Sequence, residues 1–337
     1  MSRIRVALDR TSFDLDRSPC LPSLTPEDLT ETDARALSSL ALTEHHHHGH
    51  LDPADGLPYG KFVPAVLVQL CLAGAVAWWV APERVAWELG RPWAVVAMTL
   101  ALGVPLSLFE YLYHRYLLHS SVLPFMKAMH EAHSEHHGLT TVKAAVTPQE
   151  PERKAEVDSE YPVEHKHQEA SQMFPLFSLA IFYALFFVLL SLPLLALAPG
   201  VPSVVPTIAA VTLFYVGYEV WHAVLHLPFD GFWRPLLKDE RTKGPVGRIY
   251  SFHLMHHWRP VSNLAVVGLW GYAVWDHMFR THHRPANLPL DGAEVDFHDA
   301  KLPVPRWPVS ALDRLQPRLY KVSRRLEKAL ARVFLRR

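Results

Sequence analysis

Four long apolar stretches without a single Asp, Glu, Lys or Arg limit the fold of this chain more than any other feature. A helix rises about 1.5 Å per residue, so about 20 such residues cross a hydrocarbon layer of ~30 Å. Buried helices of a large soluble domain would also be apolar, but four stretches in paired order favour membrane spans. The stretches are Phe62–Ala81, Trp93–Phe109, Phe174–Ala198 and Val204–Tyr218.

The stretches are joined in pairs by short links that contain proline, residues 82–92 and the "PGVP" of residues 199–202. Residues 265–275 are apolar but too short to span, which predicts an interfacial or re-entrant segment. We therefore expect an all-α integral membrane protein whose four transmembrane helices form two hairpins beneath a cytosolic helical cap. The expected spans are about 62–81, 93–113, 174–198 and 203–221.

The placement of Lys and Arg predicts the orientation. The two short links carry only two basic residues between them, whereas the tails and the 120–172 segment carry most of the others. The positive-inside rule then places the tails and the middle segment in the cytoplasm, at a bacterial inner membrane or the endoplasmic reticulum. The expected organisation is a cytosolic N-terminal tail (1–60), a membrane-embedded domain (61–285) and a cytosolic basic segment (286–337).

The C-terminal segment predicts a basic amphipathic helix at about 309–337. From Lys301 onward there are eleven basic and two acidic residues. Such a helix fits a bilayer surface, and packing on its own domain is an equal alternative. Residues 138–172 are polar, and we expect a loop with some helix there. The apolar positions of the amphipathic helix are Leu312, Leu315, Leu319, Val322, Leu326, Leu330 and Phe334.

Ten of the 22 histidines follow one plan that occurs twice. A pair of histidines stands at the returning end of each hairpin, "HRYLLH" and then "HAVLH", and each pair is followed by H-x-x-H-H, "HSEHH" and then "HLMHH". All ten fall on the side that Lys and Arg alone assign to the cytoplasm. They are His114, His119, His133, His136, His137, His222, His226, His253, His256 and His257.

These spacings predict a pair of metal ions, each with about five imidazole ligands. Helix positions i, i+3 and i+4 lie within about 100° of each other, so H-x-x-H-H is expected to aim three imidazoles at one point. His114 and His119 are five residues apart, which predicts an unwound or bulged helix there. Imidazole suits Fe, Zn and Cu. The chain has only two cysteines, one of them in an apolar stretch, which argues against thiolate ligands.

Several other side chains are candidates for orienting the ligands. Glu110 and Glu219 precede His114 and His222 by four and three residues, and we expect them to accept a ring N–H or to bind metal directly. His130 also lies in the first H-x-x-H-H segment, but Tyr250 stands at the matching place in the second half. We therefore predict that His130 is an outer partner or has no role. Further outer candidates are Asn263, Asp276 and His277.

The remaining histidines carry a weaker signal. His45–His48 and His50 lie in a polar tail rich in Pro, Asp and Gly, which predicts a solvated tract. We expect the others to be exposed or without a role: His165, His167, His282, His283 and His298.

The order H-x4-H, H-x2-H-H, H-x3-H, H-x2-H-H resembles the fatty acid hydroxylase / sterol desaturase superfamily of integral-membrane di-iron oxygenases. The resemblance covers roughly residues 60–285 and is most specific in the histidine order. The segment "SNLAVVGLWGYAVWDHMFRT" also resembles the family, with Asn263, Gly268, Asp276 and Phe279 at matching places. Arg280 departs from the pattern, because many members have Gly there.

The resemblance implies that the ten histidines bind two iron ions, which zinc can replace in a purified sample. The implied activity is O2-dependent hydroxylation of an unactivated C–H bond on a membrane lipid of the fatty-acyl, sphingolipid or sterol type. Desaturation of a lipid and hydroxylation of a carotenoid are alternatives within the superfamily. The chain has neither a His-Pro-Gly-Gly haem motif nor a G-x-G-x-x-G loop, so electrons would come from a separate b-type cytochrome, or from a ferredoxin with its reductase.

Two other classes of function compete with an oxygenase. The "EHHHHGH" tract suggests a metal transporter, but transport predicts ionisable residues near mid-membrane, and the apolar stretches have none. A metal-dependent hydrolase would need an exposed, water-bearing ion. The balance of 33 basic and 33 acidic residues argues against a nucleic-acid partner, and the oligomeric state is left open.

Overall fold

The computed structural model describes residues 59–120, 123, 127–139, 142–144, 153–157, 171, 173–227, 229–284, 293–295 and 304–334. The histidine tract at residues 44–50 lies outside the described residues, as do His165, His167 and His298. The chain divides into two units, and the C-terminal helix α13 (Val309–Phe334) belongs to a different unit from residues 59–308.

In the described part of the chain, four helices are long and apolar enough to cross a membrane, which indicates a membrane protein. Two of them are α2 (Tyr59–Val80) and α9 (Val204–Leu225). A third is α4 (Pro92–Tyr113), continued by the π-helical turn η3 (His114–Leu118). The last consists of α7 (Ser178–Phe186), the π-helical turn η6 (Phe187–Ser191) and α8 (Leu192–Leu197).

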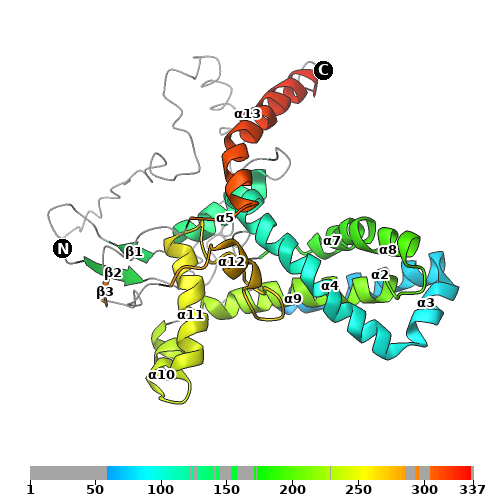
Figure 1. The fold of residues 1–337 in the computed structure, drawn as a ribbon, viewed down its shortest axis with the longest axis horizontal. Coiled ribbons are helices and arrows are strands. Elements are labelled where there is room, and N and C mark those ends of the chain that lie inside the picture. Colours follow the sequence, from blue (N-terminus) through cyan, green and yellow to red (C-terminus); the bar gives the residue numbers. More distant parts are fainter. Residues whose placement is uncertain are drawn as a thin grey trace, which may run out of the picture. The chain divides into compact units, whose positions relative to one another are not determined.

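Helix α9 packs against α2, α4 and α7, and Figure 1 shows these helices alongside one another. Their shared core is apolar and aromatic, with Leu106, Leu179, Val211 and Phe214 among its buried residues. The opposite faces of the helices are equally apolar yet exposed, reaching 83% exposure at Trp79. Apolar surface of that extent is unfavourable in water and suits lipid, which agrees with membrane spans.

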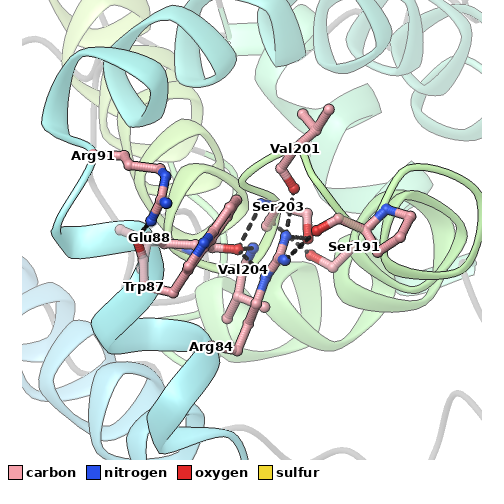
Figure 2. Close-up of polar contacts among 10 residues, drawn as sticks. Arg84, Trp87, Glu88, Arg91, Ser191, Val201, Ser203 and Val204 are labelled. Atoms are coloured by element: carbon pink, nitrogen blue, oxygen red, sulfur yellow. Dashed lines mark hydrogen bonds and ion pairs between the residues drawn. The ribbon is translucent and has the colours of Figure 1, made fainter.

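The link at residues 82–92, expected as a loop, contains the helix α3 (Pro82–Leu89). Glu88 on this helix is fully buried and accepts the backbone N–H groups of Ser203, Val204 and Val205 at 2.7–3.1 Å (Figure 2). Arg84 donates to Glu88 at 2.7 Å and to carbonyl oxygens of the 199–202 link. A buried ion pair therefore satisfies the free N–H groups at the start of α9 and joins the two links.

Residues 265–275 return alongside α4. The indole Nε1 of Trp270 donates to the Leu100 carbonyl at 3.0 Å, and that of Trp275 donates to Ser107 Oγ at 2.9 Å. Gly103 makes the approach possible, because a Cβ there would lie 2.5 Å from Nε1 of Trp270. This segment therefore packs along the side of an apolar helix.

The remaining helices surround the ends of α4 and α9 that carry histidine pairs. They are α5 (Lys127–Leu139), the π-helical turn η7 (Phe229–Trp233), α10 (Arg234–Lys238), α11 (Lys243–Trp258) and α12 (Val274–Phe279). A second buried cluster, which includes Leu225, Trp233, Tyr250 and Met255, connects α9 to α11.

The described part of the chain is predominantly helical, but it also contains a small antiparallel sheet that was not predicted from the sequence. Its strands are β1 (Val142–Ala144), β2 (Arg153–Val157) and β3 (Ala293–Val295), in the order β1-β2-β3. Val142 pairs with Val157, and Arg153 pairs with Val295. Three to five alternating residues are too few to distinguish a strand from a polar loop, so the expectation of a loop with some helix at 138–172 was wrong for these residues.

Candidate metal centre

Ten histidines come together in two adjacent groups, each able to offer five nitrogens that lie within 4.8 Å of one another. They are the ten histidines of the duplicated motifs. Among the described residues, no other His, Cys, Asp or Glu joins them. Group A consists of His114, His119, His133, His137 and His256, and group B consists of His136, His222, His226, His253 and His257.

A π-helical turn accounts for the spacing of His114 and His119. Helix α4 continues as η3, which ends where the backbone N–H of His119 donates to the carbonyl of His114 at 3.2 Å. The wider turn places residues five apart on one face, and the two imidazoles stack with centroids 5.1 Å apart. The bulge predicted from the sequence is confirmed. His130 belongs to neither group, but its Nδ1–H donates to the Leu118 carbonyl at 2.7 Å and so holds the end of this turn.

Each H-x-x-H-H motif divides between the two groups, which corrects the expectation of three imidazoles aimed at one point. The first and last histidines of a motif enter one group, and the middle histidine enters the other. Positions i and i+4 lie about 40° apart around a helix, whereas i+3 lies about 60° to the other side of i. The exchanged residues are His136 of α5, in group B, and His256 of α11, in group A.

The nitrogen separations match ligands arranged around an ion. Nε2 of His133 lies 3.1 Å from Nε2 of both His114 and His119, and Nε2 of His253 lies 2.9 Å from that of His226. Two nitrogens about 2.1 Å from one ion lie about 3.0 Å apart at 90° and about 3.4 Å apart at the tetrahedral angle. The observed spacings of 2.9–3.2 Å are therefore those of nitrogens that can share one ion.

Backbone carbonyls of one loop orient two imidazoles of group A. Nδ1 of His114 donates to the Leu264 carbonyl at 2.5 Å, and Nδ1 of His256 donates to the Ser262 carbonyl at 2.9 Å. Because Nδ1 carries the proton in both rings, Nε2 is left unprotonated and able to bind metal. Sequence reasoning missed these partners, since a backbone carbonyl leaves no signal in residue type.

Two buried carboxylates hold that loop instead of contacting the imidazoles. Glu110 accepts the backbone N–H groups of residues 266–268 at 2.6–2.8 Å. Asp276 accepts those of residues 264–265 at 3.0 Å and the hydroxyl of Thr281 at 2.7 Å. The expectation that Glu110 accepts the ring N–H of His114 is thereby corrected, because that proton goes to the Leu264 carbonyl.

The other predicted outer partners have different contacts. Oε1 of Glu219 accepts the backbone N–H of Phe174 at 2.9 Å, and Oε2 is buried without a hydrogen-bond partner in the described structure. Asn263 ties the loop to α11 by donating to the Phe252 carbonyl at 3.0 Å. His277 is exposed and stacks on His282, with ring centroids 4.3 Å apart, outside both groups. His282 and His283, expected to be exposed, are half-buried.

Burial keeps the clustered imidazoles neutral, which is the state that binds metal. Loss of water contact, followed by the charge of neighbouring imidazoles, holds the pKa of seven ligand candidates beyond the spans well below its usual 6.5. They are His119, His133, His136, His137, His253, His256 and His257. Both ring nitrogens of His137 and Nε2 of His222 are buried with no hydrogen-bond partner among the described residues. Buried polar atoms of this kind normally have a partner, so the donor set fits metal ions.

Two cavities reach the histidines. One of about 180 Å³ is lined by His133 of group A and His222 of group B, together with Met129 and Met173. The other, of about 60 Å³, lies among aromatic side chains of α4, α7 and α9 and is lined by His114. Phe174 and Tyr218 line both cavities, and their ring centroids are 5.4 Å apart.

Comparison of the chain with protein-family models, with curated proteins and with solved structures gives no match. Two histidine groups beside four apolar helices are compatible with a membrane protein that holds metal through histidine motifs.

Proposed function

We propose that this chain is a membrane di-iron oxygenase of the fatty acid hydroxylase / sterol desaturase type, which hydroxylates an unactivated C–H bond of a membrane lipid. The observation that carries the proposal is the 180 Å³ cavity that touches a ligand candidate from each of two adjacent five-histidine groups. An apolar substrate in that cavity would lie beside both ions at once.

The donor set favours iron. Five nitrogens would leave one position of a six-coordinate ion for an exogenous ligand such as O2, whereas structural zinc takes four ligands. The two groups are close, since the rings of His137 and His257 stack with centroids 4.3 Å apart. Two iron ions, when bound and reduced, supply the activation of O2 that oxidises the C–H bond.

The protein's own residues position the ligands and exclude water. Leu264 and Ser262 hold the Nδ1 protons of two imidazoles, so their Nε2 atoms face the ion. Phe174, Tyr218 and the methionines give the cavity an apolar lining. Because a cavity of about 150 Å³ is known to hold benzene, the observed 180 Å³ leaves room for a segment of roughly six carbons.

The proposal also includes a location and partners. The ten histidines would lie at the cytoplasmic face, where the positive-inside rule places the basic tails. A lipid would enter sideways from the bilayer, and a b-type cytochrome or a ferredoxin would deliver electrons. The same site would give an alcohol if oxygen is inserted and an alkene if a second hydrogen is removed.

The test is lipid analysis of membranes that contain the full chain and a compatible electron donor. We expect one lipid class to gain one oxygen atom in air and not under anaerobic conditions. His257→Ala should abolish the product, whereas the matched variant His282→Ala, outside both groups, should retain it. A mass loss of two hydrogens would identify a desaturase. An active His257→Ala protein would refute the ligand assignment, and metal uptake into vesicles without O2 consumption would support a transporter instead.

A further inference from the structure

Helix α13 exposes a continuous apolar stripe. Its members are 45–56% exposed, although they are the largest apolar side chains of the helix centre. At 100° per residue they lie within about 80° of one another around the helix, so they form one narrow face. We define the apolar stripe as Leu315, Leu319, Val322, Leu326 and Leu330.

Two polar side chains of α13 are much less exposed than the apolar stripe. Gln316 and Ser323 are each only 6% exposed, and both lie on the same flank of the helix, to one side of the stripe. The apolar side chains of the stripe are therefore the ones that this helix exposes.

The charge of α13 identifies the chemistry of that partner. The helix carries seven basic and two acidic residues, and the acidic Glu327 is paired with Arg324 at 2.6 Å. Arg318 and Arg325 border the stripe on the flank opposite Gln316, about 80–100° from its centre. Their charged ends can therefore reach outward while the stripe is buried. A second copy of the helix would bring like charges together, whereas an anionic lipid surface would complement them.

We propose that α13 lies on the bilayer surface with its stripe inserted among the acyl chains, and that it binds anionic phospholipid headgroups through the basic flank. Four helices in the described part of the chain are long and apolar enough to cross a membrane, which indicates that a bilayer lies beside the protein. This inference does not depend on the activity of the histidine groups.

The experiment places one fluorescent label at a time on the full chain in nanodiscs. Cys20 and Cys71 are first replaced by Ser, and the label is attached at Val322→Cys on the stripe or at Lys328→Cys, the matched control on the far side of the helix. Leu326→Cys repeats the stripe measurement at a second position. Nitroxide-bearing lipids and aqueous acrylamide serve as the two quenchers, in discs of phosphatidylcholine with or without phosphatidylglycerol.

We expect nitroxide lipids to quench the stripe labels, and acrylamide to quench the control label, in discs that contain phosphatidylglycerol. Arg318→Gln with Arg325→Gln should shift the inserted-to-free ratio by roughly 25-fold, about fivefold for each charge. Equal acrylamide quenching at the stripe and control positions would overturn the proposal. A disulfide between two Val322→Cys chains that depends on protein concentration would also overturn it.

Discussion

Glu110 gives the sharpest test of how the histidine groups are held. Its Oε1 accepts the N–H groups of Val266 and Val267, and its Oε2 accepts that of Gly268. In Glu110→Gln, the amide oxygen can still accept two of these N–H groups. The amide NH2 group is itself a donor, so the hydrogen bond with the third N–H is lost. Because a hydrogen bond to a charged group contributes about 1.5–3 kcal/mol, the free energy of unfolding should fall by at least about that amount.

The metal affinity of group A should fall as well. The loop held by Glu110 provides the carbonyls that orient His114 and His256, and loss of such an outer partner weakens metal binding by about 10- to 100-fold. The described carbonyl bonds of this loop go to His114 and His256 of group A, so the affinity of group B should fall less than that of group A. The assay is anaerobic titration of the detergent-solubilised full chain with Fe²⁺ against a competing chelator, together with a thermal unfolding curve.

Glu88 provides a matched control. It accepts two backbone N–H groups through Oε1 and one through Oε2, as Glu110 does, and it lies on α3, beyond the opposite end of α4 and about 30 Å away. Glu88 also accepts the Nε–H of Arg84, so Glu88→Gln should lower stability by at least as much as Glu110→Gln and leave both metal affinities intact. Unchanged group A affinity in Glu110→Gln, or equal loss of affinity in Glu88→Gln, would refute the idea that the loop orients the ligands.

Three further outcomes follow from the structure. His256→Ala should lower the metal affinity of group A by roughly two to three orders of magnitude, because four ligands together supply about 10–16 kcal/mol of binding free energy, and His136→Ala should do the same to group B. Titration of each variant against a chelator measures both affinities. Loss of affinity in the group that holds the other two histidines of the same H-x-x-H-H motif would contradict the exchange. Arg280 is exposed in the left-handed conformation, with φ of 57°, so Arg280→Gly should raise the free energy of unfolding by about 1 kcal/mol, and a lower melting temperature would contradict the account. Burial, followed by the charge of His277, lowers the pKa of His282 from 6.5 to about 4. The unfolded chain therefore binds a proton that the folded chain does not, and stability is lost as pH falls from about 6.5 to about 4. His282→Gln should flatten the dependence of the melting temperature on pH in that window, and an unchanged slope would show that His282 does not cause it.

Local periodicity explains why much of this protein can be predicted from its sequence. Four apolar stretches are long enough to span a membrane wherever they occur, because length and polarity alone meet that requirement. The five-residue gap between His114 and His119 predicts the π-helical turn, since an α-helix cannot align those positions. The duplicated order also separates the ten clustered histidines from His130, which lies in the same segment.

Tertiary structure alone decided how those parts meet. The spacing H-x-x-H-H determines two directions around a helix, but the packing of α5 and α11 decides that the middle histidines, His136 and His256, face the other group. The carbonyls of Ser262 and Leu264 became ligand partners because Glu110 and Asp276 fold the loop against α4 from more than 100 and about ten residues away. Residue spacing describes one helix at a time, whereas a metal site is built where several helices converge, and that convergence depends on long-range packing.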